Sequence, residues 1–495
     1  MTFPEYDSLD ATGLADLVRC GEVSAGEVLD AAIERLDARN PQLNAVVHPL
    51  LDRARERVET LPDGPLRGVP FLLKDLKLQL RGTPTTNATR LMRRHLATHN
   101  SLLAERYEDA GLQILGKSNS PEAGIMGITE PELYGPTRNP WSTDHTPGGS
   151  SGGTSAAVAA RIVPAGHAGD GGGSIRIPAS HTGTFGLKPT RGRVSMAPFL
   201  GESWSGFVQE HAITRSVRDS ALLLDIEGQP TLGEPYAAPP QERPWREEVG
   251  RDPGRLRLAY SADTLFAGET HLDCRAALND SVRLLAGLGH EVEEARPPFP
   301  RDELVRAYFI VVAAGVARFV DDVAEWADKK PRSEDFEPAT WILALIGWKS
   351  SAADLVWAQQ SIQRAARPIA AFFQKYDGFV TPTTARPAAR IGELALQPME
   401  RLQIKALSTV PIKALLDLAL SRMGAGKLAW TPNTQLFNQT GQPAMSVPLY
   451  WNGAGIPIGT QIVAPFGGEA MLFRLAAQLE SERPWTGRLP PGITA

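Results

Sequence analysis

Three stretches decide how this chain is interpreted: Gly148-Gly-Ser-Ser-Gly-Gly153, Asp170-Gly-Gly-Gly-Ser-Ile-Arg-Ile-Pro178 and Gly186-Leu-Lys-Pro-Thr190. The first lies between apolar segments and leads into residues 156–160, where we expect a helix to begin. That setting argues against a flexible Gly/Ser linker. Glycines free the backbone to turn tightly beside the serines, so these stretches predict a functional site.

One interpretation of the first stretch is a nucleophile elbow. Gly149-Ser-Ser151-Gly-Gly153 matches the G-x-S-x-G pattern of α/β-hydrolases, which would make Ser151 the nucleophile. That triad also requires an acid and then a histidine downstream. None of the available histidines lies in a recognisable loop after a strand that carries an acid: His167, His181, His211, His271 and His290. The pattern is therefore weakly supported.

A phosphate-binding loop is a second alternative. Gly111-Leu-Gln-Ile-Leu-Gly-Lys-Ser118 satisfies the P-loop pattern, which requires a strand before the first glycine and a helix after the lysine. Here an amphipathic helix over residues 101–110 precedes Gly111, and residues 112–115 read as an apolar strand. The context therefore favours a helix end, a strand and a turn over nucleotide binding.

Taken together, the three stretches resemble the amidase signature family. Its catalytic set is a lysine, a serine beside a cis peptide bond and a nucleophilic serine, which implies Lys74, Ser150 and Ser174 here, with a cis Gly149–Ser150 bond. The lysine lies in Gly68-Val-Pro-Phe-Leu-Leu-Lys-Asp75, where its charge interrupts a short buried strand. Other landmarks cover most of the chain: residues 116–122, 214–217, 381–383 and 438–444.

Two positions beside the implied catalytic loop depart from the family pattern. The family usually has a bulky apolar residue where Gly171 stands and a glycine where Ala168 stands. No implied catalytic side chain is missing, so we expect activity, with a looser loop geometry.

The chemistry of amide hydrolysis suits the implied residues. An amide needs an activated nucleophile, oxyanion donors and a proton for the departing amine. In the implied mechanism Ser174 attacks, and its proton passes through the Ser150 hydroxyl to neutral Lys74. Lysine acts as a base only where burial or a nearby positive charge favours its neutral form, and the apolar residues 69–73 favour burial.

The remaining implied roles belong to the glycine-rich loop. Gly171, Gly172 and Gly173 have no side chain to block a substrate, so with Ser174 they could direct backbone N–H groups at the developing oxyanion. We expect Ser151, Asp170 and Arg176 to hold the loop in place. This mechanism needs neither a metal nor an organic cofactor.

The substrate is less well defined by the sequence. Thr129-Glu-Pro-Glu132 and Gly135-Pro-Thr-Arg-Asn-Pro-Trp141 look similar to the 6-aminohexanoate-cyclic-dimer hydrolases of this family. We expect an apolar linear, cyclic or aryl amide. By family analogy Gly124, Ile125 and Met126 would line the pocket, and Trp341 and Trp348 are further candidates. The alternative is the glutaminase subunit of an aminoacyl-tRNA amidotransferase, which shares the signature.

Composition limits the other classes of function. The 495 residues are 42% hydrophobic and 22% charged with a net charge of −5, which is typical of a folded protein and gives no support for nucleic-acid binding. Cys20 and Cys274 predict no disulfide framework. We expect neither a secretory leader nor a membrane span, and therefore a cytoplasmic enzyme that acts on a small molecule, with a homodimer as one option for its assembly.

The chain is expected to form one α/β domain, the amidase signature fold, with a large twisted mixed sheet covered by helices on both faces. Its parts are a signature core over about residues 60–225, a Pro-rich connection at 229–254, helices around the pocket at about 300–375, and a C-terminal core segment at 376–485. Residues 428–468 carry no charge and predict short buried strands whose polar side chains face a central site.

Smaller features complete the prediction. Ser24 and Glu27 form a capping box for a helix that should stop at Asn40-Pro41. His95 and His99 have helical i, i+4 spacing, but without the glutamate of an HExxH site they indicate a solvated basic helix face rather than a metal site.

Overall fold

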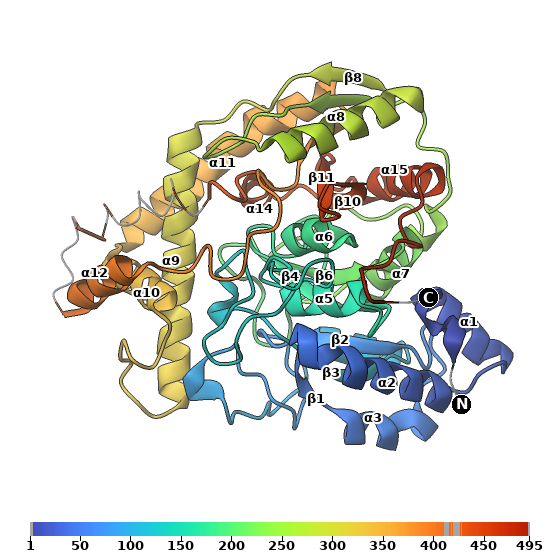
Figure 1. The fold of residues 1–495 in the computed structure, drawn as a ribbon. Helices are drawn as coiled ribbons and strands as arrows, with labels where there is room; N and C mark the ends of the chain where they lie inside the picture. Colours follow the sequence, from blue (N-terminus) through green and yellow to red (C-terminus); the bar gives the residue numbers. More distant parts are fainter. Residues whose placement is uncertain (1–2, 410–414, 417, 419–425, 427, 494–495) are drawn as a thin grey trace.

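A mixed β-sheet of eleven strands runs through the protein (Figure 1). The structure, a computed structural model, describes residues 3–409, 415–416, 418, 426 and 428–493. The strands follow one another across the sheet in this order: β1 (Val46–Pro49), β3 (Gln113–Ser118), β2 (Pro70–Lys74), β4 (Ala165–Asp170), β6 (Gln209–Thr214), β5 (Phe185–Lys188), β10 (Ala444–Trp451), β11 (Pro457–Val463), β9 (Gly378–Pro382), β7 (Arg257–Tyr260) and β8 (Glu291–Glu294).

Two parallel regions of the sheet are linked by a run of antiparallel pairings. Strands β2, β3 and β4 pair in parallel at one end, and β7 pairs in parallel with both β8 and β9 at the other. Between them β5 pairs antiparallel with β10, with Leu187 opposite Met445. Residues before 215 and residues after 256 therefore share one sheet, so the Pro-rich connection at 229–254 does not separate two independent sheets.

Helices cover the sheet on both faces (Figure 1). They are α1 (Ala11–Cys20), α2 (Ala25–Leu43), α3 (Leu51–Arg57), α4 (Leu102–Asp109), α5 (Gly152–Ala159), α6 (Arg176–Thr182), α7 (Val217–Glu227), α8 (Leu272–Gly287), α9 (Arg301–Trp326), α10 (Pro338–Lys349), α11 (Ala352–Lys375), α12 (Pro398–Thr409), α14 (Gln435–Thr440) and α15 (Glu469–Glu482), with short 3-10 helices at Pro4–Asp7, Val58–Thr60, Arg90–Met92, Glu122–Gly124 and Trp245–Glu247. Figure 1 shows α9, α10 and α12 grouped at one side of the molecule.

Strands β2 and β4 lie fully inside the core. Every residue of β2 and β4 is buried, as expected for parallel strands covered on both faces. Helix α5 packs against both strands and is also wholly buried. A glycine in β4 allows this approach, because a Cβ on Gly166 would lie only 2.7 Å from Thr154 Cγ2 of α5.

Most predicted elements are present, and three details differ. Helix α2 has the predicted capping box but runs past Pro41 to Leu43. The helix ends at Asn44, which has a left-handed backbone (φ 51°) and whose N–H donates to Asn40 O. Pro41 therefore removes only its own backbone N–H from the last turn. The Pro-rich connection contains the 3-10 helix Trp245–Glu247, anchored by the buried Trp245.

The third difference concerns His95 and His99, which do not lie on a helix. The helical turn there ends at Met92, and Leu96 forms an isolated β-bridge with Pro84. His95 packs edge-on against Trp326 and His99 against Phe199. The described residues contain no group of three or more His, Cys, Asp or Glu side chains placed to hold a metal ion.

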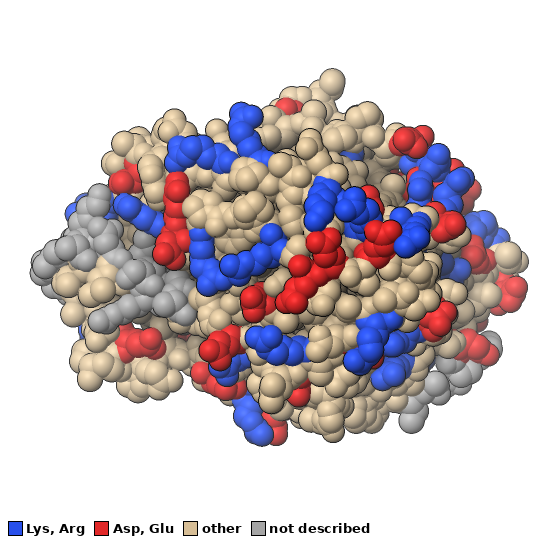
Figure 2. All heavy atoms as spheres, turned by 90° about the horizontal axis from the view of Figure 1, so that it is seen from above, with Lys and Arg blue, Asp and Glu red and all other residues tan. Residues whose placement is uncertain are grey.

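The surface carries charges of both signs. On the face shown in Figure 2, Lys and Arg side chains alternate with Asp and Glu over the described residues, without a large area of one sign. Cys20 is exposed, Cys274 is buried, and both are free. Among the described helices, none combines the length and apolar character that crossing a membrane requires.

Candidate active site

Lys74 ends strand β2 and lies fully inside the protein, with 1% of its surface exposed. Its Nζ donates hydrogen bonds to Ser150 Oγ at 2.8 Å and to Ser151 Oγ at 2.9 Å. Burial lowers the pKa of Lys74 from 10.5 to about 8, although the Glu210 and Asp170 carboxylates oppose that shift. A lysine with this pKa is neutral often enough near neutral pH to serve as a base.

The serine pair sits in the tight turn before α5. The Gly149–Ser150 peptide bond is cis, as the family resemblance implies. A Cβ on Gly149 would lie 2.6 Å from the backbone of Ile128, so glycine is required there. Ser150 and Ser151 are both buried, and Ser151 Oγ also donates to Gly169 O at 3.3 Å. Ser151 thus ties Lys74 to strand β4.

Ser174 lies in the loop between β4 and α6 and lines a cavity of about 840 Å³. Unlike Ser151, it is only half-buried, so it can meet a substrate. The two serine motifs are in contact, because the Ser151 N–H donates to Ser174 O at 3.3 Å. Lys74, Ser150 and Ser174 are therefore brought together from three separate segments of the chain.

A buried ion pair fixes the Ser174 loop. Asp170 accepts bonds from Arg176 Nε and Nη2, both at 2.9 Å, and neither residue is exposed. Burial alone would raise the pKa of Asp170, but the Arg176 guanidinium and the Asn438 amide outweigh it and hold this pKa well below its usual range. Arg176 Nη1 also donates to Gln461 Oε1 at 2.7 Å, so the uncharged segment 428–468 turns polar groups to the loop as predicted. The segment is not made of strands alone, since residues 435–440 form helix α14 before β10 and β11.

The four residues expected to supply oxyanion donors do not occupy equivalent places. Gly172 and Ser174 line the cavity. The Gly173 N–H instead donates to Asp170 Oδ1 at 2.6 Å, so this group is already engaged. Gly171 lies under the ring of Trp204, because a Cβ there would come within 2.8 Å of the indole.

Trp204 accounts for the unusual glycine at position 171. Its ring also covers Gly315, where a Cβ would lie 2.3 Å from the indole Cδ1. The indole thus fills the space into which a bulky residue at 171 would project, and it lines the cavity beside Ser174. Ala168, the other departure, is fully buried in β4 opposite His211 of β6.

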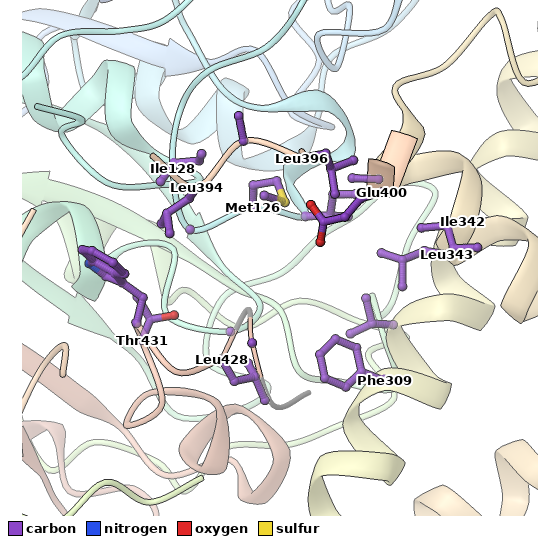
Figure 3. A pocket seen from close by; sticks show the side chains of 18 of the residues that line it. Met126, Ile128, Phe309, Ile342, Leu343, Leu394, Leu396, Glu400, Leu428 and Thr431 are labelled. Carbon is purple, nitrogen blue, oxygen red and sulfur yellow. The ribbon is translucent and has the colours of Figure 1, made fainter. Parts of the chain in front are cut away.

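The cavity walls are mainly apolar (Figure 3). Gly124, Ile125 and Met126 line it, as expected for a substrate pocket. Figure 3 shows Ile342 and Leu343 of α10 and Phe309 of α9 around the space opposite Met126. The segment before and within α12 adds a further wall with the side chains of Leu394, Leu396, Glu400 and Ile404.

Trp341 and Trp348 lie outside the set of residues that line this cavity. Trp341 is 7% exposed and packs between Phe336 and Trp348. The Trp348 Nε1 donates to Asp321 on α9 at 3.2 Å. These tryptophans therefore pack α10 against α9 and do not line the cavity, contrary to the expectation. The residues of α10 that face the cavity are Ala339, Ile342 and Leu343.

The alternative motifs are placed differently. Lys117 and Ser118 belong to strand β3, and buried Lys117 donates to Leu78 O at 2.9 Å, so most of residues 111–118 form a strand (113–118) rather than a phosphate-binding loop. Ser151 is completely buried, and its side-chain partners within the described part of the chain are Lys74 and Gly169, not a histidine. This geometry disfavours the nucleophile elbow.

A buried lysine bonded to a serine, beside an apolar cavity that a second serine lines, is an arrangement suited to hydrolysis by a serine nucleophile. A family model described as Amidase matches residues 27–473. The 6-aminohexanoate-cyclic-dimer hydrolase of Pseudomonas sp. (strain NK87) is 36% identical over 489 residues, which cover 97% of this chain and 96% of that protein.

Solved structures agree with this match. The 6-aminohexanoate cyclic dimer hydrolase complexed with substrate has a TM-score of 0.90 and 35% identity, covering 99% of this chain and 100% of that one. A bacterial aryl acylamidase of the amidase signature family has a TM-score of 0.84 and 25% identity, covering 97% and 99%. This chain therefore belongs to the amidase family and hydrolyses carbon–nitrogen bonds of carboxylic amides other than peptides.

Proposed function

We propose that this amidase works through a serine acyl-enzyme on Ser174. Ser174 Oγ forms a bond to the carbonyl carbon, and its proton passes through the Ser150 hydroxyl to Lys74 Nζ. The tetrahedral intermediate then breaks its C–N bond while the relay returns the proton to the departing amine. Water attacks the acyl-enzyme by the same relay, and the carboxylic acid leaves.

The observation that carries this proposal is the 2.8 Å hydrogen bond between Lys74 Nζ and Ser150 Oγ, in a site where Lys74 is 1% exposed. Burial keeps bulk water from protonating the base directly, and the pKa of about 8 suits proton transfer near neutral pH. Ser151 would hold Lys74 in position, and Asp170 with Arg176 would hold the loop.

The backbone N–H groups of Gly172 and Ser174 are the oxyanion donors we assign, because both residues line the cavity. Donors fixed in position before reaction stabilise developing charge without reorganising. Gly171 contributes by its lack of a side chain, which leaves room for Trp204.

The substrate we propose is an apolar linear, cyclic or aryl amide. The support is the apolar wall formed by Ile125, Met126, Phe309, Ile342 and Leu343, together with the relatives' cyclic-amide and aryl-amide activities. These same matches favour a stand-alone amidase over the glutaminase subunit of an aminoacyl-tRNA amidotransferase. We further propose one catalytic domain that acts in the cytoplasm on a small molecule, as a monomer or homodimer.

The test is hydrolysis of an anilide, a short aliphatic amide, a cyclic lactam dimer and glutamine by the wild-type enzyme and three variants. Ser174→Ala and Lys74→Ala should lose turnover while keeping their circular dichroism spectra and melting temperatures. Ser155→Ala serves as the control for loss of a buried hydroxyl away from Lys74. Full activity in Ser174→Ala would overturn the mechanism, and a preference for glutamine would favour the amidotransferase alternative.

A further inference from the structure

Tyr308 brings a hydroxyl to the proposed oxyanion loop from a distant helix. It lies on α9, is 9% exposed, and lines the same cavity as Gly172 and Ser174. A Cβ built on Gly172 would lie 2.2 Å from Tyr308 Oη, so the hydroxyl sits directly against that glycine. Any residue larger than glycine at position 172 would collide with it.

The ring that carries this hydroxyl is held firmly. It stacks on Phe207 with the two ring planes 1° apart and the centroids 5.7 Å apart, and it meets Phe309 edge-on at 5.5 Å. Phe207 is itself 1% exposed. A tyrosine packed in this way presents its hydroxyl at one place, which is what a preorganised hydrogen-bond donor requires.

The hydroxyl makes no hydrogen bond to another described residue, and the side chain, although 9% exposed, lines the cavity, so this group faces the space that a substrate would fill. Buried Tyr hydroxyls usually find a hydrogen-bond partner, because leaving one unpaired is unfavourable. Burial raises the pKa of Tyr308 above its usual value of 10.0, so the group stays protonated and remains a donor at any working pH. The hydroxyl is therefore available to donate to an acceptor on a ligand that enters the cavity.

One backbone donor of this loop is already used. The Gly173 N–H donates to Asp170 Oδ1 at 2.6 Å, and Thr434 Oγ1 fixes the neighbouring peptide by donating to Gly172 O at 2.6 Å. Of the four expected donors, the Gly173 N–H is therefore not available to a substrate oxygen.

We propose that the Tyr308 hydroxyl donates a hydrogen bond to the carbonyl oxygen of the bound amide, and that it supplements the Gly172 and Ser174 N–H groups as charge develops on that oxygen. Tyr308 is then a catalytic residue. This inference rests on the proposed Ser174 mechanism, because the position of the oxygen is defined by attack from Ser174.

The experiment compares Tyr308→Phe with the wild-type enzyme on the best amide of the panel. The variant keeps the ring and its stacking on Phe207 and loses only the donor. We expect kcat to fall by about 100-fold, the effect typical of removing one oxyanion donor, while KM changes less than about threefold. Tyr376→Phe is the matched control, because it removes a hydroxyl that bonds to Lys375 outside the cavity lining, and it should leave kcat unchanged.

A second measurement separates transition-state stabilisation from a structural role. A substrate-like aldehyde, which forms a tetrahedral adduct on a serine, should bind Tyr308→Phe more weakly by a factor close to the loss in kcat. Binding of the intact amide to Ser174→Ala and to Ser174→Ala/Tyr308→Phe, measured by calorimetry, should differ little.

Unchanged kcat and aldehyde affinity in Tyr308→Phe would overturn the inference, and so would a rise in KM alone. Neither result would affect the proposed function as long as Ser174→Ala is inactive. Conversely, if Ser174→Ala retained activity, the acyl-enzyme proposal itself would fail whatever Tyr308→Phe did.

Discussion

Lys74 Nζ lies 2.8 Å from Ser150 Oγ. The contact is shielded from solvent, since Lys74 is 1% exposed and Ser150 is 2% exposed. The contact is the point at which a side chain from strand β2 meets the loop that begins α5. Because both groups are polar and enclosed, the protonation state of one controls what the other can do.

The first prediction concerns pH. Lys74 must be neutral to accept a proton, so kcat/KM should rise about tenfold per pH unit below pH 8 and level off above it. The Glu210 charge favours protonated Lys74, so Glu210→Gln should lower its pKa and move this limb to lower pH. A pH–rate profile measures the shift. The control is Glu482→Gln, because Glu482 is exposed and is not among the charges that act on Lys74. If the rising part of the pH–rate profile did not move in Glu210→Gln, the assignment of Lys74 as the base would be contradicted.

The second prediction separates the two buried serines. Ser150→Ala removes the proposed proton relay and should lower kcat by at least about 1,000-fold, as loss of a relay member does in serine hydrolases. Ser151→Ala removes one acceptor for Lys74 and the bond to Gly169 O, so kcat should fall by only about tenfold. Single-turnover kinetics would give both values. An inactive Ser151→Ala together with an active Ser150→Ala would instead support the nucleophile elbow.

The third prediction concerns stability. Arg176→Leu leaves the Asp170 carboxylate buried without its cation, which typically costs about 3–5 kcal/mol of unfolding free energy. Urea denaturation followed by fluorescence would measure the loss. The matched control is Arg19→Ala, which breaks an exposed pair with Asp16 and should cost less than about 1 kcal/mol. Similar losses in the two variants would show that the buried pair does not anchor the loop.

The fourth prediction tests the contact between Trp204 and Gly171. Gly171→Leu alone should reduce stability and activity, because the new Cβ would lie 2.8 Å from the indole. Trp204→Gly suits the backbone there, which has a φ of 52°, and it empties the space. In the Trp204→Gly background, Gly171→Leu should therefore lower the free energy of unfolding by at least about 1 kcal/mol less than the same substitution does in the wild type. Thermal unfolding would measure these losses of stability. If the losses from the two substitutions were additive, a leucine at position 171 would not occupy the space that the Trp204 ring leaves.

The same pair offers a substrate-range experiment. Trp204→Gly enlarges the cavity beside Ser174, so kcat/KM for anilides with branched acyl groups should rise relative to acetanilide. The control is Trp348→Phe, since Trp348 lies outside the cavity lining. An unchanged ratio in Trp204→Gly would mean that the indole does not limit the acyl group.

Residues carried by a continuous motif could be found from the sequence. Lys74, Ser150 and Ser174 each lie in a stretch whose glycines and apolar flanks are recognisable, and the structure brings these three segments together. The core strands were also predictable, because buried parallel strands are short and apolar. Boundaries were less accurate, as at Pro41, where a local hydrogen bond from Asn44 decides the helix end.

Trp204 and Tyr308 could not be found in this way. Trp204 enters the cavity because residues 204, 205 and 206 all have positive φ angles (52°, 50° and 79°), a turn that only the tertiary packing enforces. Tyr308 lies in an apolar run of α9, where a residue facing a cavity has the same spacing as one facing the core. For Trp341 and Trp348 the error runs the other way. Helical spacing made them candidates for the cavity wall, although neither residue lines the cavity.

The support that Arg176 receives from Thr434, Asn438 and Gln461 has a consequence for synthesis of the protein. Chains grow at about 5–20 residues per second, so the ribosome adds residue 461 long after residue 176. During that interval the guanidinium lacks the partners that hold it in the finished enzyme, and β5 lacks β10. We therefore expect Ser174, the proposed nucleophile, to reach its working position only near the end of translation, so that the growing chain is inactive until then.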